Sequence, residues 1–136
     1  MESQRTKTCR ADADPPPIVA HGGWRYHHLG IPTEEPRAGE VYLPHLKLHV
    51  AGFETSPYGI EWMRFDPDCD VHELIRRVPH IAFEVDDLEE ALRGKTLLCA
   101  VSSPSPGVRV AMIIHDGAPI ELMQFGQQLA AGASDS

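Results

Sequence analysis

Two segments of this sequence recur in the same order, and this internal repeat restricts the possible folds more than any other feature. Residues 28–31 resemble residues 80–83, and residues 58–65 resemble residues 118–125, with Ile, Glu, Met and Phe identical at matched places in the second pair. The matched residues are His28 with His80, 52 positions apart, and Glu61 with Glu121, 60 positions apart. Such self-similarity predicts two similar structural units, each of which supplies one His and one Glu.

Most of the chain between the two ends is predicted to form short strands. Segments rich in β-forming residues are separated by turn residues, which predicts the strands 24–31, 45–53, 59–65, 80–85, 97–103, 107–115 and 118–125. Apolar residues at helical spacing predict a short helix over 70–78, with Asp70 as its N-cap. A second helix is expected over 87–92, closed by Gly94. The pattern indicates an α+β fold.

The composition is that of an ordinary globular protein, with 42% apolar and 24% charged residues. A length of 136 residues fits one domain, which we place at residues 21–125. Residues 1–20 and 126–136 are polar or small and are predicted to be disordered or flexible tails.

The net charge and the cysteines exclude several classes of partner. A formal charge of −8 disfavours nucleic acid and anionic membranes. Cys9, Cys69 and Cys99 are scattered, which argues against a disulfide framework or a cysteine metal site. We therefore expect a cytoplasmic protein with no nucleic-acid partner and no membrane segment.

Side-chain alternation along the strands tests whether the repeated residues can meet, since alternate residues of a strand share a face. In the segment 80–85, Ile81, Phe83 and Val85 form the core face, which leaves His80 on the other face. By the same reasoning all four candidate ligands share the face opposite the core: His28, Glu61, His80 and Glu121. The neighbouring His27 is expected on the opposite face, in a structural role or at the rim.

Two imidazoles and two carboxylates on one sheet face suit one divalent metal ion, such as Zn, Ni, Fe, Mn or Co. A bound cation polarises a carbonyl and stabilises an enolate, while Glu121 or Glu61 serves as the general base. A single His or Glu in a strand is more often structural, so the metal hypothesis depends on the repeat. The candidate substrate pocket on the same face comprises Met63, Phe65, Met123 and Phe125, with Arg109 as a candidate for a substrate carboxylate.

Three stretches resemble the vicinal oxygen chelate superfamily, which includes glyoxalase I, methylmalonyl-CoA epimerase, extradiol dioxygenases and bleomycin resistance proteins. They are residues 28–31, 79–92 and 117–125. The resemblance covers about residues 24–125 and implies two paired βαβββ modules, about 24–66 and 78–125, in a curved mixed sheet around a cleft. Only 13 residues, three of them prolines, separate Ile31 from His45, so the helix of the first module is expected to be shortened or absent.

The order His, Glu, His, Glu resembles the metal set of bacterial-type glyoxalase I. It also resembles that of methylmalonyl-CoA epimerase, where Gln stands at the position matching Glu61. The resemblance implies a metal-dependent lyase, isomerase or epimerase that acts on a small oxygen-rich substrate. The alternatives are a protein that sequesters a small molecule, such as an antibiotic, without catalysis, and a dioxygenase. A homodimer is also expected, because a second chain often covers the open edges of such sheets.

Overall fold

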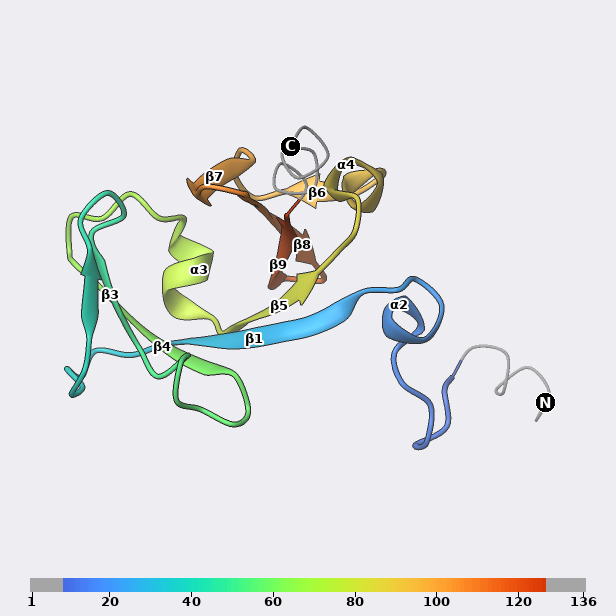
Figure 1. Cartoon of the computed structure of the whole chain (residues 1–136), viewed down its shortest axis with the longest axis horizontal. Helices are drawn as coiled ribbons and strands as arrows, with labels where there is room; N and C mark the ends of the chain where they lie inside the picture. Colours follow the sequence, from blue (N-terminus) through green and yellow to red (C-terminus); the bar gives the residue numbers. More distant parts are fainter. Residues whose placement is uncertain (1–8, 127–136) are drawn as a thin grey trace, which may run out of the picture.

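A computed structural model describes residues 9–126. It has one mixed, open sheet of nine strands and, within the described range, three short helices (Figure 1). The strands are β1 (Arg25–Pro32), β2 (Val41–Leu43), β3 (Leu48–Ala51), β4 (Ile60–Phe65), β5 (His80–Glu84), β6 (Thr96–Leu97), β7 (Ser102–Ser105), β8 (Val108–His115) and β9 (Ala118–Phe125). The helices are α2 (Pro17–Ala20), α3 (Glu73–Arg77) and α4 (Leu88–Leu92).

The sheet is arranged about the antiparallel pair β1 and β5. Its order is β2-β3-β4-β1-β5-β9-β8-β6, and β7 pairs with β8. Strand β1 pairs in parallel with β4, and strand β5 pairs in parallel with β9. The registers match, because Leu29 lies beside Ile60 in one half and Ile81 lies beside Ile120 in the other. The paired-module fold and its repeat are therefore confirmed.

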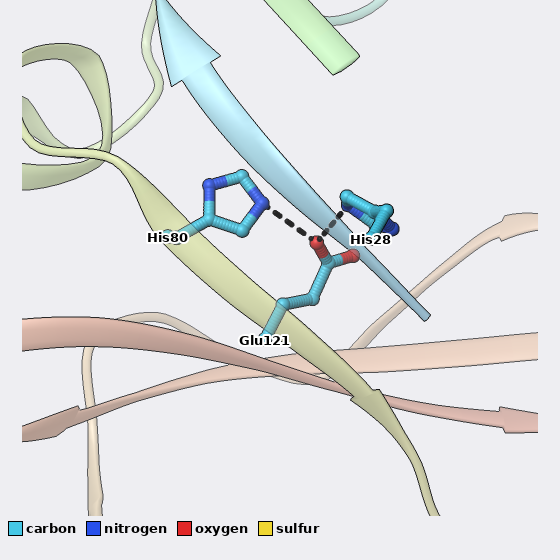
Figure 2. A group of neighbouring side chains, drawn as sticks. All are labelled: His28, His80 and Glu121. Carbon is cyan, nitrogen blue, oxygen red and sulfur yellow. Dashed lines mark hydrogen bonds and ion pairs between the residues drawn. The ribbon is translucent and has the colours of Figure 1, made fainter. Parts of the chain in front are cut away.

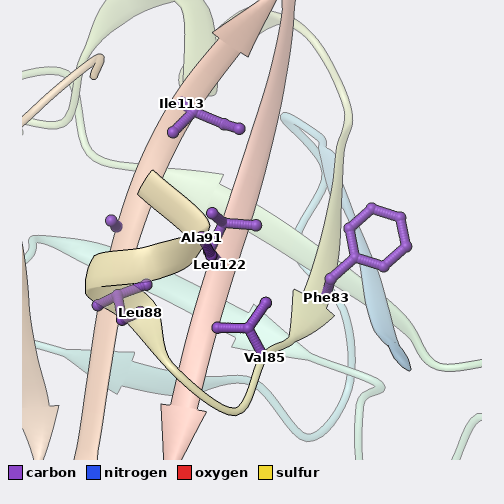
Figure 3. Packing of buried hydrophobic residues seen from close by; sticks show 7 residues of the cluster. Phe83, Val85, Leu88, Ala91, Ile113 and Leu122 are labelled. Atoms are coloured by element: carbon purple, nitrogen blue, oxygen red, sulfur yellow. The ribbon is translucent and has the colours of Figure 1, made fainter. Parts of the chain in front are cut away.

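The main hydrophobic core lies between α4 and the second half of the sheet (Figure 3). Its buried members are Phe83, Val85, Leu88, Ala91, Ala111, Ile113 and Leu122. Leu88 and Leu122 are fully buried, as helical spacing predicts for Leu88 and strand alternation for Leu122. The Asp87 carboxylate caps α4 by accepting from the Glu90 backbone N–H, and the Leu88 N–H donates to the Gln124 side chain at 2.7 Å. These contacts fix the start of α4 on β9.

The first half has no helix between β1 and β2, in agreement with the prediction from the prolines. The connecting segment instead contacts the β4 face opposite Glu61. The Arg37 guanidinium lies 3.9 Å from the centroid of the Trp62 ring, and Arg64 pairs with Glu40 at 2.7 Å. The hydrogen bond from Arg64 lowers the pKa of Glu40 to about 2. A cation-π contact and an ion pair thus lie on the face that a helix covers in the other half.

Several boundaries differ from the sequence prediction. Residues 17–20, assigned to the N-terminal tail, form α2, and Ile18 packs against the main core. Helix α3 begins at Glu73 and not near Asp70, because the His72 ring accepts from the Leu74 backbone N–H and caps the helix there. Strand β2 was not predicted. Of the predicted tails, 1–20 and 126–136, the parts at 1–8 and 127–136 lie outside the described residues.

No helix in residues 9–126 is long and apolar enough to span a membrane.

Replacing Leu122 with Ala should destabilise the fold by about 2–5 kcal/mol, because it leaves a cavity in the core beneath α4. Urea denaturation followed by circular dichroism measures this loss. The matched control is Leu97→Ala, since Leu97 is 47% exposed and its truncation should change the free energy of unfolding by less than about 0.5 kcal/mol. Equal losses in the two variants would contradict the assignment of the core.

Candidate metal centre

The four repeated residues lie in two rows that cross the centre of the sheet. Ala82 lies between His28 on β1 and Glu121 on β9, and Gly30 lies between His80 on β5 and Glu61 on β4. Side chains of directly paired residues point to the same face of a sheet. Each His and Glu therefore flank a small residue, across which their long side chains can approach each other.

Three of the four side chains form a compact group (Figure 2). The Glu121 Oε1 atom lies 3.0 Å from His80 Nε2 and 3.3 Å from His28 Nε2. One ligand atom from each of these residues lies within 4.8 Å of the others. Glu61 lies next to the group, with its Oε1 atom 3.6 Å from His28 Nε2, but does not belong to this set of three.

The two carboxylates have different electrostatic surroundings. Burial raises the pKa of Glu121, but the hydrogen bonds with His28 and His80 outweigh this effect and bring the pKa to about 2. Burial also raises the pKa of Glu61. The charge of His28 offsets this effect only in part, and the pKa of Glu61 therefore stays above its ordinary value. Burial lowers the pKa of His28, but the hydrogen bond and charge of Glu121 reverse this effect and leave it raised. Glu121 is therefore the carboxylate whose negative charge the two imidazoles stabilise.

Gly30 is required by the close approach of His80. A Cβ atom at this position would lie 2.3 Å from the Cε1 atom of the His80 ring and 2.8 Å from both ring nitrogens. His80 is only 2% exposed, and its Nδ1 atom has no hydrogen-bond partner among the described residues. Packing against Gly30 thus holds this imidazole with Nε2 directed at Glu121.

His27 lies on the same side as His28, contrary to the prediction from simple alternation. The β1 and β5 register shifts between Tyr26 and His28, so that His27 is an extra residue in a β-bulge. The Nδ1 atoms of His27 and His28 are 2.7 Å apart. The His27 ring also stacks on Phe53 and on Phe125, with both centroid distances at 5.2 Å. Sequence reasoning missed this contact because a bulge has no reliable single-sequence signal.

An apolar cavity of about 350 Å³ lies beside the three-residue group. His80 and Glu121 line it, together with the predicted pocket residues Met63 and Phe65. Helix α3 covers it with Ile75, which is in agreement with the position of α3 between the two halves in Figure 1. The apolar wall also includes the residues Leu48, Val71, Val110 and Met112, which sequence reasoning did not select. Alternation along 107–115 could have identified Val110 and Met112, because Met112 pairs with Glu121.

The other predicted pocket residues lie elsewhere. Met123 is buried on the strand face of Glu121 but does not line this cavity, and Phe125 contacts His27. Arg109 lies on the opposite face, because it pairs with Gln124 across β8 and β9 and donates to Glu89 of α4 at 2.6 Å. Arg109 is thus occupied by a salt bridge and does not face the pocket.

A second cavity of about 530 Å³ lies at the C-terminal end of β3. Glu61 lines it, as do Phe53 and the cationic side chain of Arg37. Phe53 also contacts the edge of the His28 ring at a centroid distance of 5.7 Å. The three-residue group is therefore flanked by an apolar cavity at His80 and a more polar one at Glu61.

The donor set fits a divalent metal ion. Two imidazole nitrogens and one carboxylate oxygen converge from three different strands, and all three residues are largely buried. Two His and one carboxylate, with further positions left for water or substrate, are a common ligand set of catalytic metal sites. His28, His80 and Glu121 could hold such an ion, with Glu61 as a neighbouring carboxylate.

The likeness to solved structures confirms the fold. A hypothetical protein from Bacillus halodurans C-125 matches with a TM-score of 0.57 at 18% sequence identity, over 74% of this chain and 94% of that chain. Methylmalonyl-CoA epimerase from Mycobacterium tuberculosis matches with a TM-score of 0.54 at 21% identity, over 79% of this chain and 91% of that chain. No family model matches the sequence, and no curated protein matches it either.

Replacing Gly30 with Ala should lower metal affinity by about tenfold or more, because the new methyl group displaces the His80 ring from its position beside Glu121. Competition with a chromogenic chelator measures the affinity for Co²⁺ or Zn²⁺. Ala82→Gly, at the matching position beside His28, is the control and should retain affinity within about threefold. An unchanged affinity in the Gly30 variant would show that His80 does not bind the metal.

Proposed function

We propose that this chain is a metal-dependent isomerase, epimerase or lyase that moves a proton next to a carbonyl group of a small substrate. The observation that carries the proposal is the convergence of His28, His80 and Glu121 with a second carboxylate, Glu61, beside them. The epimerase-like fold is compatible with this chemistry. A bound divalent ion would supply a Lewis acid that polarises the substrate carbonyl and makes the adjacent C–H bond more acidic.

The two carboxylates take different roles in this proposal. Glu121 is held by both imidazoles, and its low pKa makes it a persistent ligand and a poor proton acceptor. Glu61 lies outside the compact group and has a raised pKa, which brings it nearer to the range of an effective general base. Glu61 accepts the proton from the substrate carbon and returns it to the neighbouring carbon, which completes an isomerisation; an epimerisation additionally requires a proton donor on the opposite face of the carbon.

The size and the apolar wall of the cavity beside His80 and Glu121 favour a small substrate with an apolar body. Its volume of about 350 Å³ is at the lower end of the range for ligand sites, and most of its wall is apolar. A compact carbonyl compound with an apolar body fits this surface. The apolar body would contact Met63, Met112 and Ile75, while the carbonyl group and its acidic C–H bond would extend past the metal ligands to Glu61, which lines the second cavity.

The first test is metal content. Protein purified without chelator and reconstituted with Co²⁺ or Zn²⁺ should hold about one equivalent, measured by elemental analysis after gel filtration. Glu121→Gln should lower metal affinity by about 10–100-fold, because it removes the anionic oxygen shared by the two imidazoles. A wild-type protein that retains less than about a tenth of an equivalent after reconstitution would refute the proposal.

The second test is exchange of the substrate proton. The metal-loaded protein should catalyse the incorporation of deuterium from D₂O next to the carbonyl of small 2-substituted ketones and 2-oxo acids, followed by proton NMR. Glu61→Gln should bind metal within about threefold of wild type but slow exchange by at least about 10²-fold, the usual contribution of a general base.

Comparison of the wild type with Glu61→Gln separates three interpretations: Glu61 as the base, another residue as the base, and binding without catalysis. Exchange that survives in Glu61→Gln would assign the base to another group, with Glu121 as the first candidate. A metal-loaded wild type that binds such compounds without exchanging their protons would instead favour a sequestering protein. The expected homodimer stays a prediction, which analytical ultracentrifugation checks.

A further inference from the structure

His27 and His28 form a direct contact between two imidazoles at the edge of the metal centre. Their Nδ1 atoms are 2.7 Å apart, which is a hydrogen-bond distance. The other ring nitrogen of His28, Nε2, lies 3.3 Å from Glu121 in the three-residue group. The His28 ring therefore connects the candidate metal site on one side to His27 on the other.

This hydrogen bond has two possible directions, and only one permits His28 to bind a metal. A ligating imidazole presents a lone pair at one nitrogen and carries its proton on the other. If Nε2 of His28 is the ligand atom, Nδ1 of His28 carries the proton and donates it to Nδ1 of His27. If His27 donates instead, the proton of a neutral His28 resides on Nε2 and blocks that ligand atom.

We propose that His27 is a positioning residue for the metal centre, which accepts the Nδ1 proton of His28 and so directs the Nε2 lone pair of His28 to the ion. The inference rests on the proposed function, since it requires a metal at this site. His80 has no equivalent partner, because its Nδ1 atom is buried against Gly30 without a hydrogen bond within residues 9–126. The two halves therefore orient their histidines by different means, the first by a hydrogen bond and the second by packing.

The surroundings of His27 hold its ring in the orientation that this role needs. The ring lies between Phe53, at an interplanar angle of 17°, and Phe125, at 29°. Phe53 follows β3 in the first half, and Phe125 ends β9 in the second half. Stacking restricts rotation of the ring, and the β-bulge places its side chain on the same face as that of His28. The position of Nδ1 is thus determined by both halves of the sheet.

Two substitutions separate a hydrogen-bonding role from a packing role. His27→Phe keeps an aromatic ring between Phe53 and Phe125 but removes the acceptor. His27→Asn removes the ring but places a carbonyl oxygen close to the position of Nδ1. The readout is the affinity for Co²⁺ from chelator competition, together with the visible absorption spectrum of the bound Co²⁺, which reports the ligand geometry. Thermal unfolding of each metal-free variant shows that it folds.

We expect His27→Phe to lower Co²⁺ affinity by about 10–100-fold and to alter the Co²⁺ spectrum, whereas His27→Asn retains affinity within about fivefold. A packing role predicts the reverse order, with Phe close to wild type and Asn impaired, and that result would overturn the inference while leaving the proposed function intact. A wild type that binds no Co²⁺ would overturn both. If His27→Phe does not fold, His27→Leu replaces it as the variant without an acceptor, with the same expected loss.

Discussion

The antiparallel pairing of β1 with β5 is the constraint on which the rest of the structure depends. Leu29 and Ile81 face each other at its centre, so His28 pairs with Ala82 and His80 pairs with Gly30. The parallel neighbours β4 and β9 then bring Glu61 and Glu121 to the same two rows. A shift of one residue in this register would place one of the two histidines on the opposite face and so separate the candidate ligands.

Charge compensation at Glu121 is the second determinant of the site. A carboxylate removed from water is costly unless nearby groups stabilise its negative charge. The two imidazole Nε2 atoms, at 3.0 and 3.3 Å from Oε1, supply this stabilisation. A divalent cation could take over the same role, because the same three atoms converge on one point. The arrangement that stabilises the buried carboxylate is therefore also one that prepares a binding site.

The two halves share a backbone pattern but differ in how they are covered. Helix α4 buries the outer face of the second half and forms the main core with Leu122 and its neighbours. In the first half, the segment after β1 places Arg37 on Trp62 and Glu40 on Arg64 in place of a helix. The hydrophobic core is consequently concentrated in the second half. The candidate metal centre lies at the boundary of the two halves: the first half supplies His28, the second supplies His80 and Glu121, and Glu61 of the first half lies beside them.

The sequence by itself determined the repeat, the common face of His28, Glu61, His80 and Glu121, and the loss of the first helix, because side-chain alternation and proline act locally. Only the tertiary structure decided which ligands form the compact group, since the approach of His80 to Glu121 depends on strand register and on the space above Gly30. It also decided the position of the His27 ring beside His28, because a β-bulge is a property of the pairing between two strands and not of one strand. Likewise, alternation could place Arg109 on a strand, but the position of α4 and its Glu89 decided its partner.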